Sequence, residues 1–373
     1  MEKIKMVDLR QQYLAIKPEI DEAIFGVLDS TAFIQGEPVE QFASALSSYT
    51  GGSQVVSCAN GTDALQIAMM ALDLVPGDEI ILPVHTYVAT AEVIALLKLK
   101  PVFVDVDPAT FNIDVSRIEE NITPRTKAIV PVHLYGQCAD MEPILRIAKR
   151  HNLYVIEDAA QALGALYTFA DGSQHQAGTM GVIGTTSFFP SKNLGCYGDG
   201  GAMFTGDSAL AEKLKMISNH GQRIKYHHDI IGVNSRLDTL QAAILNVKLK
   251  YLDRYTEKRN EIASLYDSHL AGIDFLSVPY RAPFSTHVFH QYTITVHGRD
   301  RNKLQEFLRS KGVPTMIYYP VPLHLQKAYR NATYPQGTFP ITESLSASVL
   351  SLPIHTEMNE AEVEYISRII RSF

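Results

Sequence analysis

The segment TTSFFPSKNLGCYGDGGAMFT, from Thr185 to Thr205, carries a single lysine, Lys192, in a glycine-dense loop between two β-prone runs. Glycine lets a backbone approach a ligand closely and adopt positive φ. In a pocket that excludes water, the pKa of a lysine amine falls, and the neutral amine becomes a nucleophile for a carbonyl carbon. The segment therefore predicts either a ligand-binding lysine or an ordinary exposed lysine in a turn.

On the N-terminal side of this segment, strand-like runs alternate with helix-like runs. The expected strands are Gln54–Cys58, Glu79–Leu82, Val102–Val106, Lys127–His133 and Leu153–Ile156, and the expected helices are Thr62–Leu74, Thr86–Leu97 and Met141–His151. This alternation predicts an α/β fold in which helices cover both faces of a mostly parallel sheet. Ligands of such sheets bind at the carboxyl ends of the strands.

The length of 373 residues is enough for two domains. We expect residues 1–250 to form a large α/β domain with an N-terminal helical segment, and residues 251–373 a smaller C-terminal α+β domain. A long helix from Asp238 to about Leu265 should lead out of the first domain, and Ser344–Leu350 should form a helix in the second. The short run 33–36 is expected to be a connector rather than part of a substrate site.

Composition excludes several classes of protein. The net charge of −7 is spread without a basic stripe, so nucleic-acid binding is not expected. The three cysteines have no zinc-site spacing, and their odd number argues against a disulfide framework, which is typical of a reducing compartment. No signal-peptide core and no membrane-spanning apolar run is present. We therefore expect a soluble, cytoplasmic protein.

Candidate functional residues follow the expected strands. Gly61 and Thr62 stand at a helix start that would suit an anion, although Asn-Gly-Thr is also a good turn and N-cap. Tyr87 follows the next strand and would stack on a planar ring or pack in the core. Asp158 ends a buried strand, where a carboxylate needs a cationic partner such as a protonated ring nitrogen. Gln161, in the same turn, would reach a ring substituent.

The loop GQRIKYHH, residues 221–228, is basic and aromatic and is followed by GVNSRLD. It would hold a phosphate or form a solvated surface loop, and Arg236 would make a bidentate contact with a carboxylate. The histidine pair lacks a third ligand at usable spacing, so no zinc site is expected.

The motifs NGTDAL, PVHTYVATAE, PVFVDVD, IVPVHLYGQCADM, VIEDAAQALGA, SFFPSKNLG, GDGG and GVNSRLDTLQAA occur in order across almost the whole chain. Together they resemble the DegT/StrS-type sugar aminotransferases, which are pyridoxal-phosphate enzymes of fold type I. The GQRIKYHH loop with GVNSRLDTLQAA is similar to the subgroup that acts on nucleotide-linked 3-keto-6-deoxyhexoses.

This resemblance implies a role for each matching residue. Lys192 would bind the cofactor covalently and act as the catalytic base, and Asp158 would pair with the pyridine nitrogen. The remaining cofactor contacts would be Tyr87 on the ring face, Gln161 near the ring hydroxyl, and Gly61, Thr62 and Ser187 at the phosphate. Asn234 would reach the phosphate from the neighbouring subunit, so the active unit would be a homodimer. Candidates for the substrate are Lys225, Tyr226, Arg236 and His324.

One position departs from the pattern of the subgroup. Several relatives that act at C3 carry tyrosine three residues before the lysine, where this chain has Phe189. A hydroxyl that would touch the sugar is therefore absent, which leaves the substrate less defined than the reaction. The related dehydratases carry histidine in place of the lysine, so Lys192 argues against dehydration.

The activity implied by the resemblance is amino transfer from L-glutamate to the 3-keto group of a dTDP-linked 3-keto-6-deoxyhexose. The products would be 2-oxoglutarate and a dTDP-3-amino-3,6-dideoxyhexose for lipopolysaccharide or S-layer glycan, with pyridoxamine phosphate as the alternate cofactor form. Two alternatives remain open: amination at C4 of a 4-keto sugar, and a regulatory homologue that binds the cofactor without turnover. A nicotinamide dehydrogenase is not expected, because no GxGxxG follows the first strand.

Overall fold

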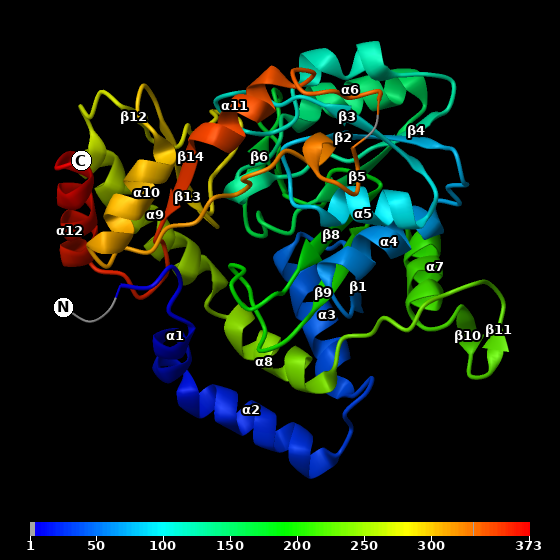
Figure 1. Cartoon of the computed structure of the whole chain (residues 1–373). Helices are drawn as coiled ribbons and strands as arrows, with labels where there is room; N and C mark the ends of the chain where they lie inside the picture. The colour runs from blue at the N-terminus through cyan, green and yellow to red at the C-terminus, as the bar shows by residue number, and fades with distance from the viewer. Residues whose placement is uncertain (1–3, 331) are drawn as a thin grey trace.

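The computed structural model describes residues 4–330 and 332–373, and a seven-stranded sheet lies at its centre (Figure 1). The strand order is β1 (Gln54–Cys58), β9 (Gly201–Thr205), β8 (Ile183–Ser187), β5 (Tyr154–Asp158), β4 (Thr126–Ile129), β2 (Glu79–Pro83) and β3 (Lys100–Val104). Neighbouring strands are parallel, except that β9 is antiparallel to both β1 and β8. The predicted α/β fold with a mostly parallel sheet is confirmed.

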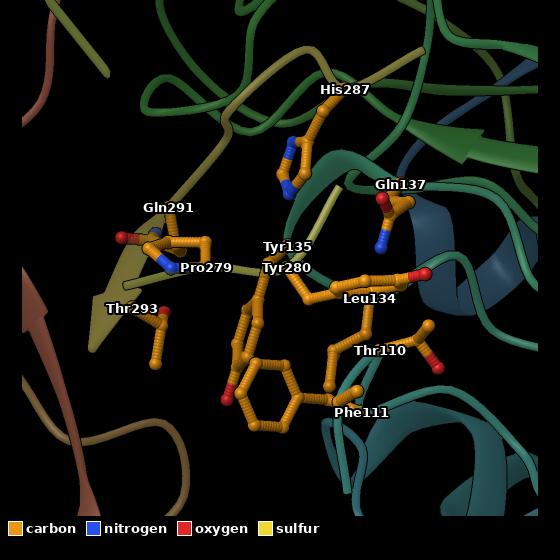
Figure 2. Close-up of a pocket in the computed structure, with 11 residues that line it drawn as sticks. Thr110, Phe111, Leu134, Tyr135, Gln137, Pro279, Tyr280, His287, Gln291 and Thr293 are labelled. Atoms are coloured by element: carbon orange, nitrogen blue, oxygen red, sulfur yellow. The ribbon is translucent and has the colours of Figure 1, made fainter. Parts of the chain in front are cut away.

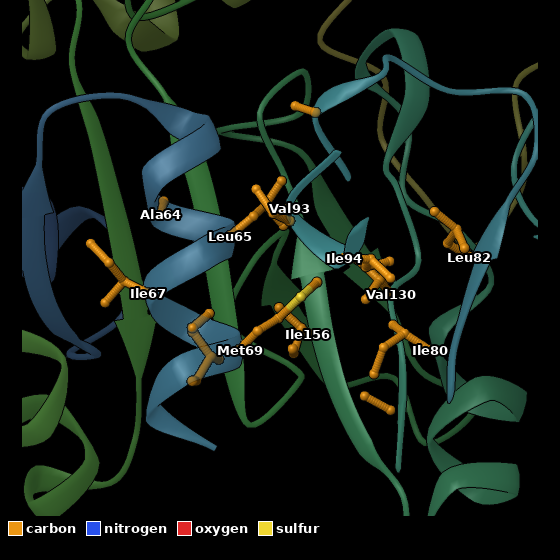
Figure 3. Packing of buried hydrophobic residues seen from close by; sticks show 14 of the residues in the cluster. Ala64, Leu65, Ile67, Met69, Ile80, Leu82, Val93, Ile94, Val130 and Ile156 are labelled. Carbon is orange, nitrogen blue, oxygen red and sulfur yellow. The ribbon is translucent and has the colours of Figure 1, made fainter. Parts of the chain in front are cut away.

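Helices cover both faces of this sheet. On one face, α4 (Gly61–Ala71), α5 (Ala89–Leu96) and α7 (Ser208–Ser218) pack on side chains such as Ile80 and Leu82 (Figure 3). On the other face, Ile81 packs with α6 (Met141–His151), and α3 (Glu37–Tyr49) covers β9. Successive residues of β2 thus point to opposite cores, which explains why the strands read as continuous apolar runs.

The long helix expected from Asp238 is wrong as a single element. The chain forms α8 (Thr239–Leu249) and α9 (Leu252–Leu270), and α8 packs on α2 (Lys17–Ser30), which follows the short α1 (Leu9–Ala15). At the break, the N–H groups of Lys250 and Tyr251 donate to carbonyls three residues earlier, which tightens the turn. The break lets α8 pack against the large sheet while α9 follows a second core.

The second core surrounds a small antiparallel sheet of β12 (Leu276–Ser277), β13 (Tyr292–Val296) and β14 (Val349–Leu352). Helices α9, α10 (Arg301–Ser310) and α12 (Glu360–Arg371) contribute side chains to this core, whereas Leu345 of α11 (Pro340–Ser348) packs in a separate cluster with Val106 and Leu134. The helix expected over Ser344–Leu350 is wrong at its end, because Val349 and Leu350 pair with β13. The predicted domain boundary at residue 250 falls between α8 and α9. It stays a prediction, because Ile4, which was assigned to the large domain, packs in this second core.

Two short hairpins were not expected from the sequence. They are β6 (Leu166–Thr168) with β7 (Gln174–Gln176), and β10 (Gln222–Ile224) with β11 (His227–His228). The second hairpin projects beyond α7 at the edge of the molecule (Figure 1). Four 3₁₀ turns complete the described elements: η1 (Val115–Arg117), η2 (Glu119–Asn121), η3 (Leu134–Gly136) and η4 (Leu323–Leu325). Among the described residues, no helix is both long and apolar enough to cross a membrane.

Candidate active site

The ends of β5 and β8 meet the start of α4 at the carboxyl edge of the large sheet. Asp158 is the last residue of β5 and pairs with Thr185 of β8, so Ser187 lies just beyond it on the neighbouring strand. A Cβ atom on Gly61 would lie 2.7 Å from the Cβ of Ser187. Such a distance is far inside van der Waals contact, so only glycine lets the helix start approach the strand this closely.

The start of α4 is built to receive an anion. The Asn60 side chain caps the helix by accepting from the N–H of Asp63 at 2.8 Å, while the Asn60 carbonyl accepts from the N–H of Ala64. The earlier N–H groups of a helix have no partner inside it and carry the positive end of the helix dipole. The half-buried hydroxyls of Thr62 and Ser187 border the same helix start. This combination suits a phosphate group.

Asp158 is a buried carboxylate, 7% exposed, that the protein holds from four directions. Its Oδ2 accepts from the Thr90 hydroxyl at 2.9 Å, and its Oδ1 accepts from the N–H of Ala160 at 3.1 Å. Its main chain bonds to Pro131 and His133 of the adjacent segment. Within the described chain, Asp158 takes part in no salt bridge. The carboxylate can therefore still accept a hydrogen bond from a cationic group of a bound ligand.

Lys192 lies in the loop that follows β8, and its N–H donates to the Phe189 carbonyl at 2.8 Å. Burial of the amine lowers the pKa of Lys192 from its usual value to about 8, against the opposing attraction of Asp158. The next residue, Asn193, donates to the Val288 carbonyl at 2.8 Å and fixes the loop to the segment that leads to β13. The amine thus reaches its neutral, nucleophilic form only slightly above neutral pH.

An aromatic layer borders these groups. Tyr87 is 57% exposed, and its ring centroid lies 6.0 Å from that of Tyr319. Gln161 donates to the Tyr319 hydroxyl at 3.2 Å and accepts from the N–H of Tyr135 at 2.8 Å. Tyr135, Tyr319 and Thr90 were not found from the sequence. Thr90 lies in the same PVHTYVATAE motif as Tyr87, and that proximity was the available signal.

Several predicted substrate residues lie apart from this group. Lys225 and Tyr226 form the turn of the β10–β11 hairpin, where Tyr226 is 79% exposed. Asn234 is exposed and Arg236 is half-buried. The intervening Ser235 accepts from the N–H of Ala59 at 3.1 Å, so this segment runs beside the end of β1. The roles of these residues remain predictions.

The surroundings of His324 do not favour a direct substrate contact in this conformation. Its imidazole is fully buried, it contacts the Phe339 ring edge-on, and its Nε2 lies 3.1 Å from Oε1 of Glu343. Burial lowers the pKa of His324, although Glu343 acts in the opposite direction. A substrate would reach this ring only if the Glu343 contact opened.

A separate narrow cavity of about 10 Å³ lies between η3 and the segment that leads to β13 (Figure 2). Its lining includes Phe111, Tyr135, Gln137, His287 and Gln291. None of the predicted site residues lines it. The functional groups therefore gather at the strand ends and not in this cavity.

The profile of the DegT/DnrJ/EryC1/StrS aminotransferase family matches residues 14–371. The chain belongs to this family. It is thus a pyridoxal-phosphate-dependent sugar aminotransferase of fold type I, as the resemblance implied.

Named relatives span nearly the whole aminotransferase. A "Pleiotropic regulatory protein" of Geobacillus stearothermophilus is 47% identical and covers 99% of this chain and 98% of its own. A UDP-2-acetamido-2-deoxy-3-oxo-D-glucuronate aminotransferase of Pseudomonas aeruginosa is 45% identical (97% and 98%). A dTDP-3-amino-3,6-dideoxy-alpha-D-galactopyranose transaminase of Aneurinibacillus thermoaerophilus is 43% identical (99% of each chain).

Solved structures agree with the fold. S. venezuelae DesV superimposes with a TM-score of 0.95 at 39% identity, covering 100% of this chain and 98% of its own. The ntda protein of Bacillus subtilis, solved with bound pyridoxamine phosphate, gives a TM-score of 0.86 at 36% identity (95% and 82%). The residues of this chain fit that cofactor: an anion-binding helix start, a buried carboxylate without a salt bridge and an amine of lowered pKa lie at one sheet edge.

Proposed function

We propose that this aminotransferase moves an amino group from L-glutamate to the 3-keto group of a dTDP-linked 3-keto-6-deoxyhexose. The main support for this substrate is the 43% identity, over 99% of both chains, to a transaminase whose name specifies a dTDP-3-amino-3,6-dideoxyhexose. The product would be an amino sugar of the kind built into lipopolysaccharide or S-layer glycans. A cytoplasmic location is part of this proposal.

A second substrate class is favoured by a specific observation. The relatives at 45% and 44% identity are named for UDP-linked 3-oxo or 3-dehydro sugars, so amination at C3 is shared while the nucleotide differs. The C4 alternative has less support, because a relative named GDP-perosamine synthase is 36% identical over 89% of the chain. The relative named as a regulatory protein keeps the non-catalytic alternative open.

The proposed chemistry assigns one task to each group. Bound pyridoxal phosphate supplies the carbonyl that takes up the amino group and the ring that accepts electrons from the donor. Lys192 removes and returns the proton at the reacting carbon, which requires the neutral amine that burial favours. Asp158 holds a proton on the ring nitrogen. Thr62, Ser187 and the start of α4 bind the phosphate, and Tyr87 covers one face of the ring.

The neighbouring subunit would complete the site through Asn234, so the proposed active unit is a homodimer. Large apolar side chains are exposed at Phe25 on α2 and at Ile224 and Ile231 around the projecting hairpin, and Ile231 is 86% exposed. Apolar side chains exposed to this degree are common in surfaces that a partner covers. They support the proposal that a second copy packs against this edge.

Product identification by NMR tests the proposal. The purified protein, L-glutamate and pyridoxal phosphate are incubated with dTDP-linked 3-keto-6-deoxyhexoses of both C4 configurations, with UDP-linked 3-keto sugars, and with dTDP-4-keto-6-deoxyglucose. We expect an amine at C3 of a dTDP-linked sugar, and no product from Lys192→Ala. Lys303→Ala, on the exposed face of α10, should match the parent protein.

Each other outcome has a distinct meaning. Faster amination of the UDP-linked sugars would show that the preferred substrate carries UDP instead of dTDP, and the assigned amination at C3 would stand. An amine only at C4 would contradict the assigned position. Absence of 2-oxoglutarate from a protein that retains the cofactor would favour the regulatory alternative, and full turnover by Lys192→Ala would contradict the assigned catalytic base.

A further inference from the structure

Thr90 is a fully buried residue in the first turn of α5, and its side chain turns away from its own helix. A threonine hydroxyl inside a helix commonly donates to a carbonyl one turn earlier. Here the hydroxyl donates to Oδ2 of Asp158 instead, at 2.9 Å. The bond joins α5 to the end of β5, 68 residues apart in the chain.

Both donors to the Asp158 carboxylate are neutral. Thr90 bonds one oxygen, and the N–H of Ala160 bonds the other at 3.1 Å. Unlike an arginine or lysine at this place, neither donor carries a positive charge. Each oxygen also keeps a lone pair for a further partner. The two donors therefore hold the carboxylate in place and leave it able to accept from a further donor.

We propose that Thr90 is a positioning residue that keeps the Asp158 carboxylate oriented toward the ring nitrogen of pyridoxal phosphate. This inference rests on the proposed pairing of Asp158 with that nitrogen. Without the hydroxyl, the carboxylate would lose one of its two orienting contacts and would pair less closely with the ring nitrogen. The ring nitrogen would then be protonated to a smaller extent.

The test uses the holoprotein without substrate and does not depend on turnover. Thr90→Val keeps the shape of the side chain and removes its hydroxyl, whereas Thr90→Ser keeps the hydroxyl. For each variant, absorbance is titrated against pH to give the apparent pKa of the Lys192–cofactor chromophore, and the dissociation constant of pyridoxal phosphate is measured. A less protonated ring withdraws fewer electrons, so Thr90→Val should raise that pKa by about one unit and weaken binding about tenfold. Thr90→Ser should restore both values.

A matched control separates this effect from loss of stability. Thr205 is another buried threonine of the same sheet, and its hydroxyl donates to the Val182 carbonyl at 2.9 Å. Thr205→Val should leave the titration unchanged. The same shift in Thr205→Val, or no shift in Thr90→Val, would overturn the inference. If Thr90→Val does not fold, Thr90→Ala gives the same comparison.

Asp158→Asn distinguishes the inference from the pairing on which it rests. That variant removes the charge itself and should shift the titration further than Thr90→Val. A shift in Asp158→Asn without one in Thr90→Val would leave the pairing intact and overturn the role of Thr90. An unchanged titration in Asp158→Asn would contradict both.

Discussion

At the scale of single residues, the amine of Lys192 is the most consequential group. Burial lowers the pKa of Lys192 to about 8, so the unliganded amine is protonated below that pH and neutral above it. Only the neutral form attacks an aldehyde. The rate at which pyridoxal phosphate attaches to the cofactor-free protein should therefore rise about tenfold per pH unit below 8 and level off above it.

Stopped-flow absorbance over a pH series measures this rate. The same series with Nα-acetyl-lysine corrects for ionisation of the cofactor itself. If the corrected rate of cofactor attachment still rises steeply between pH 9 and about 10, the pKa of Lys192 is that of an ordinary lysine. That result would contradict the burial of the amine.

At the scale of elements, Glu157 connects β5 to the loop before β8. Its buried carboxylate accepts from the N–H groups of Gly178 and Met180 at 2.8 and 2.6 Å, and from Nε2 of His133 at 2.8 Å. Since Nδ1 of His133 accepts from the N–H of Ala139, the proton lies on Nε2. In Glu157→Gln, the side-chain NH₂ group would face some of these N–H donors, so their hydrogen bonds would be lost. We expect the free energy of unfolding to fall by about 3 kcal/mol.

Chemical denaturation measures the change. The control is Glu261→Gln, which removes an exposed partner of Lys258 on α9 and should cost less than about 0.5 kcal/mol. Equal losses in the two variants would contradict the proposed link between β5 and the loop.

The sequence was sufficient to predict the elements that depend on local sequence patterns. The β/α alternation and the position of Asp158 at a strand end follow from apolar periodicity and from parallel-sheet topology. Other features depend on distant partners. The chain breaks between α8 and α9 because the two helices pack in different cores. Val349 is in a strand because it pairs with β13. The Thr90–Asp158 bond could not be predicted because it depends on where packing against the sheet places α5 relative to the end of β5.

At the scale of the whole molecule, the proposed homodimer makes a specific prediction about shared sites. Lys192→Ala and Asn234→Ala homodimers should each lose turnover. A hybrid of the two, purified through different affinity tags, should regain it, because one of its sites combines Lys192 of one chain with Asn234 of the other. Assay of the purified hybrid measures this. An inactive hybrid would indicate that each site takes Lys192 and Asn234 from the same chain, and would contradict the shared arrangement. The control is a dimer of two Lys192→Ala chains that carry different tags, which should stay inactive.

The support around Asp158 has a consequence for how long the cofactor stays bound. In the proposed transamination the covalent bond to Lys192 would be given up for part of every cycle, and the pyridoxamine form would be held by non-covalent contacts alone. Here the carboxylate and the main chain of Asp158 are already fixed by protein donors and acceptors, and the cradle at Gly61 is closed by contact with Ser187. Little ordering remains to be done when the pyridoxamine form binds. On the proposed assignment, retention of the cofactor between half-cycles would therefore depend on how slowly the pyridoxamine form dissociates from these preformed contacts.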